Sequence, residues 1–290
     1  MIISKSWFGE NKNGKIQINS RIIYRELSPQ IIEKLNQNLS VSHILNWMRH
    51  QTTEAFRTQY KKNLELGALN KVVGDWNEFI ATSLLSEIVI DKNKNQGILC
   101  AVFSLPSSRL QKEGNNEVSS KFLSLFSNKE FTNKESLSKI AFLKNQIFLS
   151  SPDYIIVAIN RDKFATTVQI LLEQQLSAPD SFAVYDFFKG KLQAQDLKAV
   201  ASLKTSNRPD RRYQPLFEAA MVKAMGYVLQ QNWQYYMVTS KLSSADRTIF
   251  STAVAPHGIA LEQNFNLVDG TYLYNRKEDL VPLIESAIQQ

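Results

Sequence analysis

The sequence predicts an α/β fold, in which a central β-sheet is flanked by helices and follows a mainly helical N-terminal part. Some segments carry apolar residues at the spacing of an amphipathic helix, and others are short apolar runs between turn residues, as is typical of buried strands. A hydrophobic content of 43% with 16 phenylalanines is enough for a substantial core. Because no internal repeat or long linker interrupts the chain, we expect one domain over residues 1–290. Residues 1–70 are expected to support a core of residues 71–290.

Taken in order, the chain opens with short β-like pieces in residues 1–20. The expected helices cover residues 29–65 in two parts, then 74–88, 162–176, 209–229 and 278–288. The expected strands cover residues 97–105, 147–149, 154–159, 182–187, 199–204 and 234–239, with a further one at 252–255. Residues 67–74 are expected to form a loop, and weak helical pieces are expected at 119–127 and 134–143.

The composition favours a polyanionic partner and a reducing compartment. Lys and Arg outnumber Asp and Glu by 34 to 27, which gives a net charge of +7 and a pI near 9.3. This charge suits nucleic acid, although many basic proteins bind none. The single cysteine, Cys100, excludes an internal disulfide and a multi-cysteine zinc site. Without a signal peptide or a run of about 18 apolar residues, the chain is expected in the cytoplasm, with no membrane partner.

The chemistry is expected where the strand at 199–204 passes through a polar turn into a helix that begins near Pro209. Ser202 and Lys204 are two residues apart on this strand, so their side chains share one face. In the major groove, an arginine at a helix start can hold guanine bidentately, and an aspartate can accept from cytosine. The plainer alternative is a solvated basic turn that caps the helix. The charged residues at this helix start are Arg208, Asp210, Arg211 and Arg212.

Two acidic residues elsewhere in the chain are candidates for the same site. Asp153 follows Pro152 where the strand at 154–159 leaves its turn, a position that suits a metal ligand and equally an ordinary turn residue. Glu78 lies three residues after Asp75 at the expected start of a helix. That spacing is a loose capping box, so Glu78 is either a helix cap or a functional acid.

Magnesium-dependent phosphodiester hydrolysis needs acidic oxygens for the ion, a group that orients the water, and positive charge near the phosphate. The general nuclease pattern is Pro-Asp, a gap, then (Asp/Glu)-x-Lys on one strand. Pro179-Asp180 followed by Asp196-Leu197-Lys198 matches this pattern literally. We reject this match because residues 189–198 are polar without a β signature, which places the pair on an exposed helix or loop with surface contacts only.

The alternative set is Asp153, Ser202-x-Lys204 and Glu218, in which a serine holds the acidic position of the pattern. A serine hydroxyl is a poor magnesium ligand, so a carboxylate must come from elsewhere. Glu218 on the following helix is able to reach back toward the strand end and supply it.

Around these residues the chain resembles the type II restriction endonucleases that cut at CCGG-centred sites, a group of the PD-(D/E)xK nuclease superfamily with a displaced glutamate. The first matching block is Ser202-x-Lys204-Thr205-x-x-Arg208-Pro209-Asp210-Arg211-Arg212-x-Gln214-x-x-x-Glu218. The other blocks are Ile2-Ile3-Ser4-Lys5-Ser6, Gly74-Asp75-Trp76-Asn77-Glu78 and Ser150-Ser151-Pro152-Asp153. Together they cover most of the chain in order, with looser similarity at residues 106–145 and in the C-terminal third.

The resemblance implies a catalytic role for five residues. Asp153 and Glu218 would hold Mg²⁺, and Lys204 would orient the attacking water and stabilise the phosphate. Ser202 would support the site, and Glu78 would be an auxiliary acid. The implied fold is the restriction-endonuclease-like mixed sheet flanked by helices.

The resemblance also implies how DNA is recognised. Arg208, Asp210 and Arg211 would read the CCGG core from the major groove, and Arg212 would contact a phosphate or another subunit. Relatives carry an arginine shortly before the tryptophan that follows the long helix. Here Gln230-Gln231-Asn232 stands in that place, so the sequence predicts the CCGG core and leaves the flanking bases open.

The implied activity is double-strand cleavage before the first cytosine of a palindrome of the RCCGGY type, which leaves four-base 5′ overhangs. The enzyme would act as a homodimer or homotetramer, because a palindromic site matches a two-fold symmetric protein. A cognate DNA methyltransferase would be present in the same host. Two alternatives are a DNA repair nuclease of the same fold and a sequence-specific DNA-binding protein that does not cleave.

Overall fold

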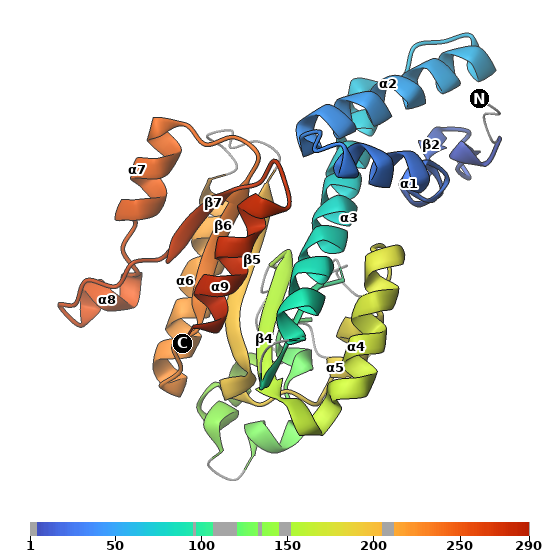
Figure 1. Ribbon diagram of the computed structural model, residues 1–290. Coiled ribbons are helices and arrows are strands. Elements are labelled where there is room, and N and C mark those ends of the chain that lie inside the picture. The colour runs from blue at the N-terminus through green and yellow to red at the C-terminus, as the bar shows by residue number, and fades with distance from the viewer. Residues whose placement is uncertain are drawn as a thin grey trace.

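The computed structural model describes residues 5–94, 97–106, 121–132, 135–144, 152–204 and 212–289. At its centre lies a five-stranded mixed sheet with the strand order β3-β4-β5-β6-β7 (Figure 1). Helices flank this sheet, so the expected fold class is confirmed. The strands are β3 (Ile98–Ser104), β4 (Tyr154–Asn160), β5 (Leu197–Lys204), β6 (Gln234–Thr239) and β7 (Gly270–Leu273).

The pairing of β4 with β5 decides where the candidate site forms. β4 is antiparallel to both of its neighbours, β3 and β5, whereas β6 and β7 run parallel to β5. Tyr154 at the start of β4 lies opposite Ala201 near the end of β5. The residue before β4, Asp153, is therefore brought beside the end of β5, where Lys204 lies.

Helices cover both faces of the sheet (Figure 1). α6 (Tyr213–Leu229) lies behind the sheet in this view, and α9 (Val281–Ile288) lies in front of it. α3 (Leu66–Asn93) packs along β3 with α4 (Arg161–Ser177) beside it. α7 (Ser244–Thr252) and α8 (Pro256–Ala260) stand between β6 and β7 in the chain. None of the helices in the described residues is long and apolar enough to cross a membrane.

The N-terminal part consists of a small hairpin and two helices that gather around the first half of α3 (Figure 1). β1 (Phe8–Glu10) pairs with β2 (Ile16–Ile18), and α1 (Ser20–Asn36) and α2 (Val41–Tyr60) follow. The two expected helical parts are thus confirmed, although α1 begins earlier than expected. Short 3-10 helices complete the described elements: Lys5–Trp7, Leu123–Leu125, Asn128–Phe131, Ser136–Lys144, Ala194–Asp196 and Glu278–Leu280.

The expected loop at 67–74 is wrong, because these residues belong to α3. Leu69, Val72 and Trp76 recur at helical spacing on the buried side of the helix. Their packing outweighs the low helix propensity of the two glycines in this stretch. The division at residue 70 between the N-terminal part and the core therefore falls within one continuous helix.

The expected capping box of Asp75 and Glu78 is wrong for the same reason, since both residues lie inside α3. Asp75 instead accepts a hydrogen bond from Ser20 Oγ at 2.7 Å, which ties α3 to the start of α1. Glu78 is therefore not a helix cap, and of the two roles considered for it the functional acid is left.

Two of the expected strands are wrong. Residues 182–187 fall in the helix α5 (Ala183–Phe188), where Val184 and Phe188 are buried at helical spacing and Phe188 stacks on Phe103 of β3 at 5.5 Å between ring centroids. This packing overrides the preference of aromatic residues for strands. At 252–255, α7 runs to Thr252 and the described residues form only an isolated bridge at Val254. β7 was not predicted, and the run at 147–149 lies outside the described residues.

α6 presents a different face to the sheet from the one that its apolar spacing predicts. The apolar residues at helical spacing, which predict the buried stripe of this helix, are Phe217, Met221, Ala224, Met225 and Val228. Two of them, Phe217 and Val228, are 53% and 39% exposed. The buried side of the helix instead carries Pro215, Glu218, Ala219, Val222, Met225 and Leu229. A carboxylate therefore lies on the face of α6 that packs against the sheet, and it needs polar partners there.

Candidate active site

Asp153 and Lys204 meet where β4 begins and β5 ends. The Oδ2 atom of Asp153 accepts a hydrogen bond from Lys204 Nζ at 3.0 Å and another from the backbone N–H of Leu203 at 2.6 Å. The side chains of Asp153 and Lys204 are 20% and 16% exposed. The ion pair is thus open to a ligand from solvent, yet shielded enough for its charges to interact more strongly than on a free surface.

Glu218 reaches the same strand from α6, and three donors hold its carboxylate. Ser202 Oγ donates to Oε2 at 2.6 Å, and the Tyr235 hydroxyl donates to Oε2 at 3.0 Å while lying 2.7 Å from Ser202 Oγ. Gln214 Nε2 donates to Oε1 at 3.1 Å. Ser202 therefore does not take the place of a carboxylate, but orients the one that α6 supplies.

Sequence reasoning missed the roles of Gln214 and Tyr235. The position of Gln214 four residues before Glu218 is a detectable signal, because side chains at that spacing meet on a helix. Tyr235 gives no such signal. It lies opposite Val200 in the parallel pair of β5 and β6, on the same face as Ser202, and only the strand order reveals this.

The surrounding charges keep Lys204 protonated. Burial lowers the pKa of Lys204, but the charges of Asp153 and Glu218 and the hydrogen bond to Asp153 outweigh it, so the pKa lies above its ordinary value. Burial raises the pKa of Glu218, and the charge of Asp153 adds to this rise against the hydrogen bond from Ser202 and the charge of Lys204. Lys204 is therefore a cation and hydrogen-bond donor at neutral pH, and it is not available as a base.

Glu78 belongs electrostatically to the same group of charges. Desolvation by the surrounding protein raises the pKa of Glu78 from 4.5 to about 8. The negative charges of Asp153 and Asp75 add to this rise, and the positive charge of Lys204 opposes it. The side chain also reaches solvent, so Glu78 is able to exchange protons with water. Its backbone carbonyl accepts from the Tyr154 hydroxyl at 2.8 Å, which fixes this turn of α3 against the first residue of β4.

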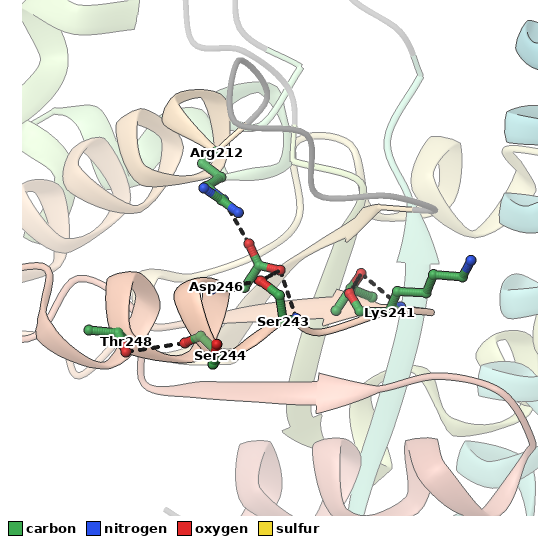
Figure 2. A network of polar contacts seen from close by, with 7 residues as sticks. Arg212, Lys241, Ser243, Ser244, Asp246 and Thr248 are labelled. Atoms are coloured by element: carbon green, nitrogen blue, oxygen red, sulfur yellow. Dashed lines mark hydrogen bonds and ion pairs between the residues drawn. The ribbon is translucent and has the colours of Figure 1, made fainter.

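The residues expected to read DNA are only partly described. Arg208, Asp210 and Arg211 lie outside the described residues. Arg212 precedes α6, and its Nε donates to Asp246 Oδ1 on α7 at 2.7 Å (Figure 2). Its side chain is 18% exposed, so the guanidinium is directed into the protein. Asp246 was not foreseen, because nothing in the sequence relates it to a residue so far away in the chain.

The rejected pair is used for structure. Asp180 is buried and binds the guanidinium of Arg25 at 2.6 Å, which ties residue 180 to α1. Asp196 Oδ2 accepts from the backbone N–H of Gln193 at 2.8 Å and so caps a short 3-10 helix. The expected helix is right for Asp196, but the expected exposure is wrong for both residues. Asp196 is half-buried, and Lys198 lies in β5 and is half-buried as well.

Comparison with known proteins gives this geometry a context. Residues 3–290 match the Cfr10I/Bse634I restriction endonuclease family. The chain belongs to that family. It is 26% identical over 272 residues to the type II restriction enzyme Cfr10I of Citrobacter freundii, and the alignment covers 89% of this chain and 88% of that enzyme. The expected class, a type II site-specific DNA endonuclease, is thereby confirmed.

Solved structures of the family share the fold of this endonuclease. The type IIF restriction endonuclease Bse634I with cognate DNA superposes with a TM-score of 0.76 at 19% identity, covering 99% of both chains. A second Bse634I structure gives a TM-score of 0.75 at 19% identity, covering 100% of both chains.

The donor set of the endonuclease fits a hard divalent cation. The charge of Asp153 raises the pKa of both Glu78 and Glu218, and a cation beside Asp153 would relieve this repulsion. Among the described residues, both side-chain hydrogen bonds of Asp153 fall on Oδ2. Within the described ranges, no three His, Cys, Asp or Glu side chains form a ready-made metal group. Mg²⁺ does not need one, because it binds through one or two carboxylates, waters and substrate phosphates.

Proposed function

We propose that this endonuclease cuts both strands of DNA in a Mg²⁺-dependent reaction at a palindrome with a CCGG core, of the RCCGGY type. Cleavage before the first cytosine leaves four-base 5′ overhangs. The observation that carries the proposal is the convergence of two carboxylates and one ammonium at the end of β5, within a chain whose family cuts DNA.

In the proposed reaction, each residue has a role that its contacts support. Asp153 and Glu218 hold Mg²⁺, which when bound supplies positive charge to the phosphate and activates water. Lys204 stays protonated, so its ammonium orients the attacking water and stabilises the negative charge that develops on the phosphate. Ser202 and Tyr235 hold the Glu218 carboxylate in place. Glu78 is an auxiliary acid whose raised pKa allows it to take up a proton near neutral pH.

The proposed recognition of the CCGG core rests on Arg208, Asp210 and Arg211 in the major groove. Arg208→Ala is expected to weaken discrimination against altered sites by about 1–3 kcal/mol, because a bidentate contact between arginine and guanine is lost. Cleavage of a panel of plasmids that differ in one base of the core measures this. Full selectivity in the Arg208→Ala variant would contradict the assignment.

The proposed assembly is a homodimer or homotetramer, since two copies of one active site are needed to cut both strands of a palindrome symmetrically. We propose that the enzyme works in the cytoplasm beside a cognate DNA methyltransferase that protects the host's own sites. Loss of cleavage on plasmid methylated within the core is the expected result for such a pair.

Incubation of the protein with plasmid DNA and Mg²⁺, followed by sequencing of the fragment ends, tests the proposal. Discrete fragments with CCGG-containing ends and 5′ overhangs are expected. Nicking that follows DNA structure instead of sequence would indicate a repair nuclease. A gel shift without cutting would indicate a binding protein that does not cleave.

A further inference from the structure

One short stretch of chain contacts both flanks of the segment 205–211, which carries the proposed base-reading residues. On one flank, the backbone N–H of Ser240 donates to the carbonyl of Lys204, the last residue of β5, at 3.4 Å. On the other flank, Arg212 Nε donates to Asp246 Oδ1 at 2.7 Å. Ser240 follows β6 and Asp246 lies in the first turn of α7. Residues 240–246, which are the β6–α7 connection with the first turn of α7, therefore hold Lys204 and Arg212 relative to each other.

The acceptor in this arrangement is itself firmly held. Asp246 Oδ2 accepts from the backbone N–H and the hydroxyl of Ser243 at 2.9 and 2.7 Å, and the N–H of Asp246 donates back to Ser243 Oγ at 3.1 Å (Figure 2). This reciprocal capping box fixes the start of α7. The Asp246 side chain is only 4% exposed. Arg212 is thus bound to a rigid helix end and not to a mobile surface carboxylate.

The charge state of Asp246 supports a strong contact. Burial raises the pKa of Asp246, but the hydrogen bonds from Ser243 and the charge of Arg212 outweigh it, so the pKa lies below its ordinary value. The carboxylate is ionised at neutral pH. Hydrogen bonds between charged groups are shorter and more directional than neutral ones, which suits a contact that sets a position.

We infer that Asp246 and Arg212 are positioning residues for sequence recognition. Through them and Ser240, the β6–α7 connection fixes Lys204 and Arg212, the described residues on either side of the segment that carries the proposed base-reading residues. The inference rests on the proposed function and deepens it. Hydrogen bonds to base edges require donors and acceptors held within about 0.5 Å of their productive geometry. Asp246 engages the Nε donor of Arg212, so this contact serves recognition by fixing where Arg212 lies.

The test compares sequence discrimination with stability. Asp246→Asn keeps an acceptor for the Ser243 N–H, but its amide nitrogen then faces the Arg212 donor, so the ion pair is broken with little change in shape. The measured quantity is the ratio of cleavage rates at the preferred site and at sites with one altered base, taken from a library of randomised sites with Mg²⁺. We expect this ratio to fall by about tenfold or more, since misplacing one good base contact costs that much selectivity.

Lys223→Met is the matched control, because it removes another ion pair of the same helix. Lys223 Nζ lies 2.6 Å from Asp269, which follows α8 in the chain. This variant is expected to lower Tm while leaving the discrimination ratio at the wild-type value. A purely structural role of Asp246 would likewise lower Tm and total activity without changing the ratio.

Two further variants keep the inference testable if Asp246→Asn does not fold. Arg212→Lys retains the charge but cannot present Nε to Asp246, and it is expected to lower the same ratio. A double-mutant cycle compares Arg212→Ala, Asp246→Ala and the variant that carries both changes. The double variant is expected to discriminate no worse than either single variant, because each single change already removes the same Arg212–Asp246 contact. Wild-type discrimination in the folded variants would overturn the inference alone. Failure of the wild-type protein to cut at discrete sites would overturn the proposed function, and the inference with it.

Discussion

Of the three Pro-Asp pairs in the sequence, Pro152-Asp153 and Pro179-Asp180 lie in the described residues, and they differ in their surroundings. The side chain of Asp180 is 2% exposed, and its Oδ2 atom forms ion pairs with two arginines of α1. Arg25 Nη2 lies 2.6 Å and Arg21 Nε lies 3.8 Å from Oδ2. Its negative charge is thereby neutralised by the protein. Asp153 is paired with Lys204 at 3.0 Å, but it also raises the pKa of Glu78 and Glu218.

The difference shows that local charge balance separates a structural aspartate from a functional one. A carboxylate with two arginines has no need of a cation, and it contributes to stability. Carboxylates that repel one another around a single lysine are kept together at a cost to stability, which is typical of sites that bind an ion or perform chemistry. The Pro-Asp dipeptide alone does not distinguish the two cases.

The largest expected effect is the loss of DNA cleavage when the pair of Asp153 and Lys204 is broken, which no change at Asp180 should cause. Lys204→Ala or Asp153→Ala is expected to abolish cleavage, because the first removes the only ammonium near the carboxylates among the described residues and the second removes a proposed metal ligand. Binding to a CCGG-containing duplex in Ca²⁺ is expected to remain close to wild type. Plasmid cleavage and a gel shift measure the two quantities, and unchanged cutting by either variant would remove the proposed site.

Asp180→Asn is the matched control at the second described Pro-Asp pair. It is expected to cost about 1–3 kcal/mol of stability, because a buried carboxylate that binds arginine is replaced by an amide. Tm should fall, while the cleavage rate at a temperature where the variant is folded should equal that of the wild type. If Asp180→Asn lost cleavage while folded, the distinction between the two aspartates would be wrong.

A smaller effect, on the Mg²⁺ requirement of cleavage, is expected when a group that hydrogen-bonds Glu218 is removed. Tyr235→Phe removes the hydroxyl that lies 3.0 Å from Glu218 Oε2 and 2.7 Å from Ser202 Oγ. Loss of such a supporting contact should raise the Mg²⁺ concentration needed for half-maximal cleavage by roughly tenfold. Tyr236→Phe is the control, since it removes a hydroxyl from the next residue of β6, whose side chain points to the opposite face. Equal Mg²⁺ requirements for the two variants would contradict the role of Tyr235.

The smallest expected effect concerns pH. The pKa of Glu78 is raised in the folded protein from 4.5 to about 8, so the folded state holds more protons than the unfolded state between these values. Stability contributed by protonated Glu78 is therefore lost as pH rises through this window. Glu78→Gln is expected to have a Tm close to wild type at pH 5 and a higher Tm than wild type at pH 8.5. Because the side chain reaches solvent, the gain should be modest, and a Tm difference that does not change with pH would contradict the raised pKa.

Much of the fold could be predicted from the sequence, because its signals are local. The strands at 97–105, 154–159, 199–204 and 234–239 are apolar runs, and each is confirmed within two residues of its ends. The errors come from tertiary packing. α3 continues through two glycines because its apolar face is buried, and α5 is helical despite its aromatic residues because Phe188 packs on β3.

The candidate site divides in the same way. Ser202 and Lys204 share a strand face by local geometry, and the antiparallel pairing of β4 and β5 then brings Asp153 to them. Tyr235 and Asp246 could not be predicted, since their contacts depend on strand order and on the path of the chain after β6. The apolar spacing of α6 even predicts a face that turns out to be exposed at Phe217.

A crystal structure of the protein with Mn²⁺ and a duplex containing CCGG tests the central claim most directly, because Mn²⁺ replaces Mg²⁺ and is located by its anomalous scattering. We expect an ion bound by the carboxylates of both Asp153 and Glu218, with the Lys204 ammonium beside the phosphate to be cut. An ion held at Asp180 or Asp196, with Asp153 and Glu218 far from the phosphate, would contradict the account.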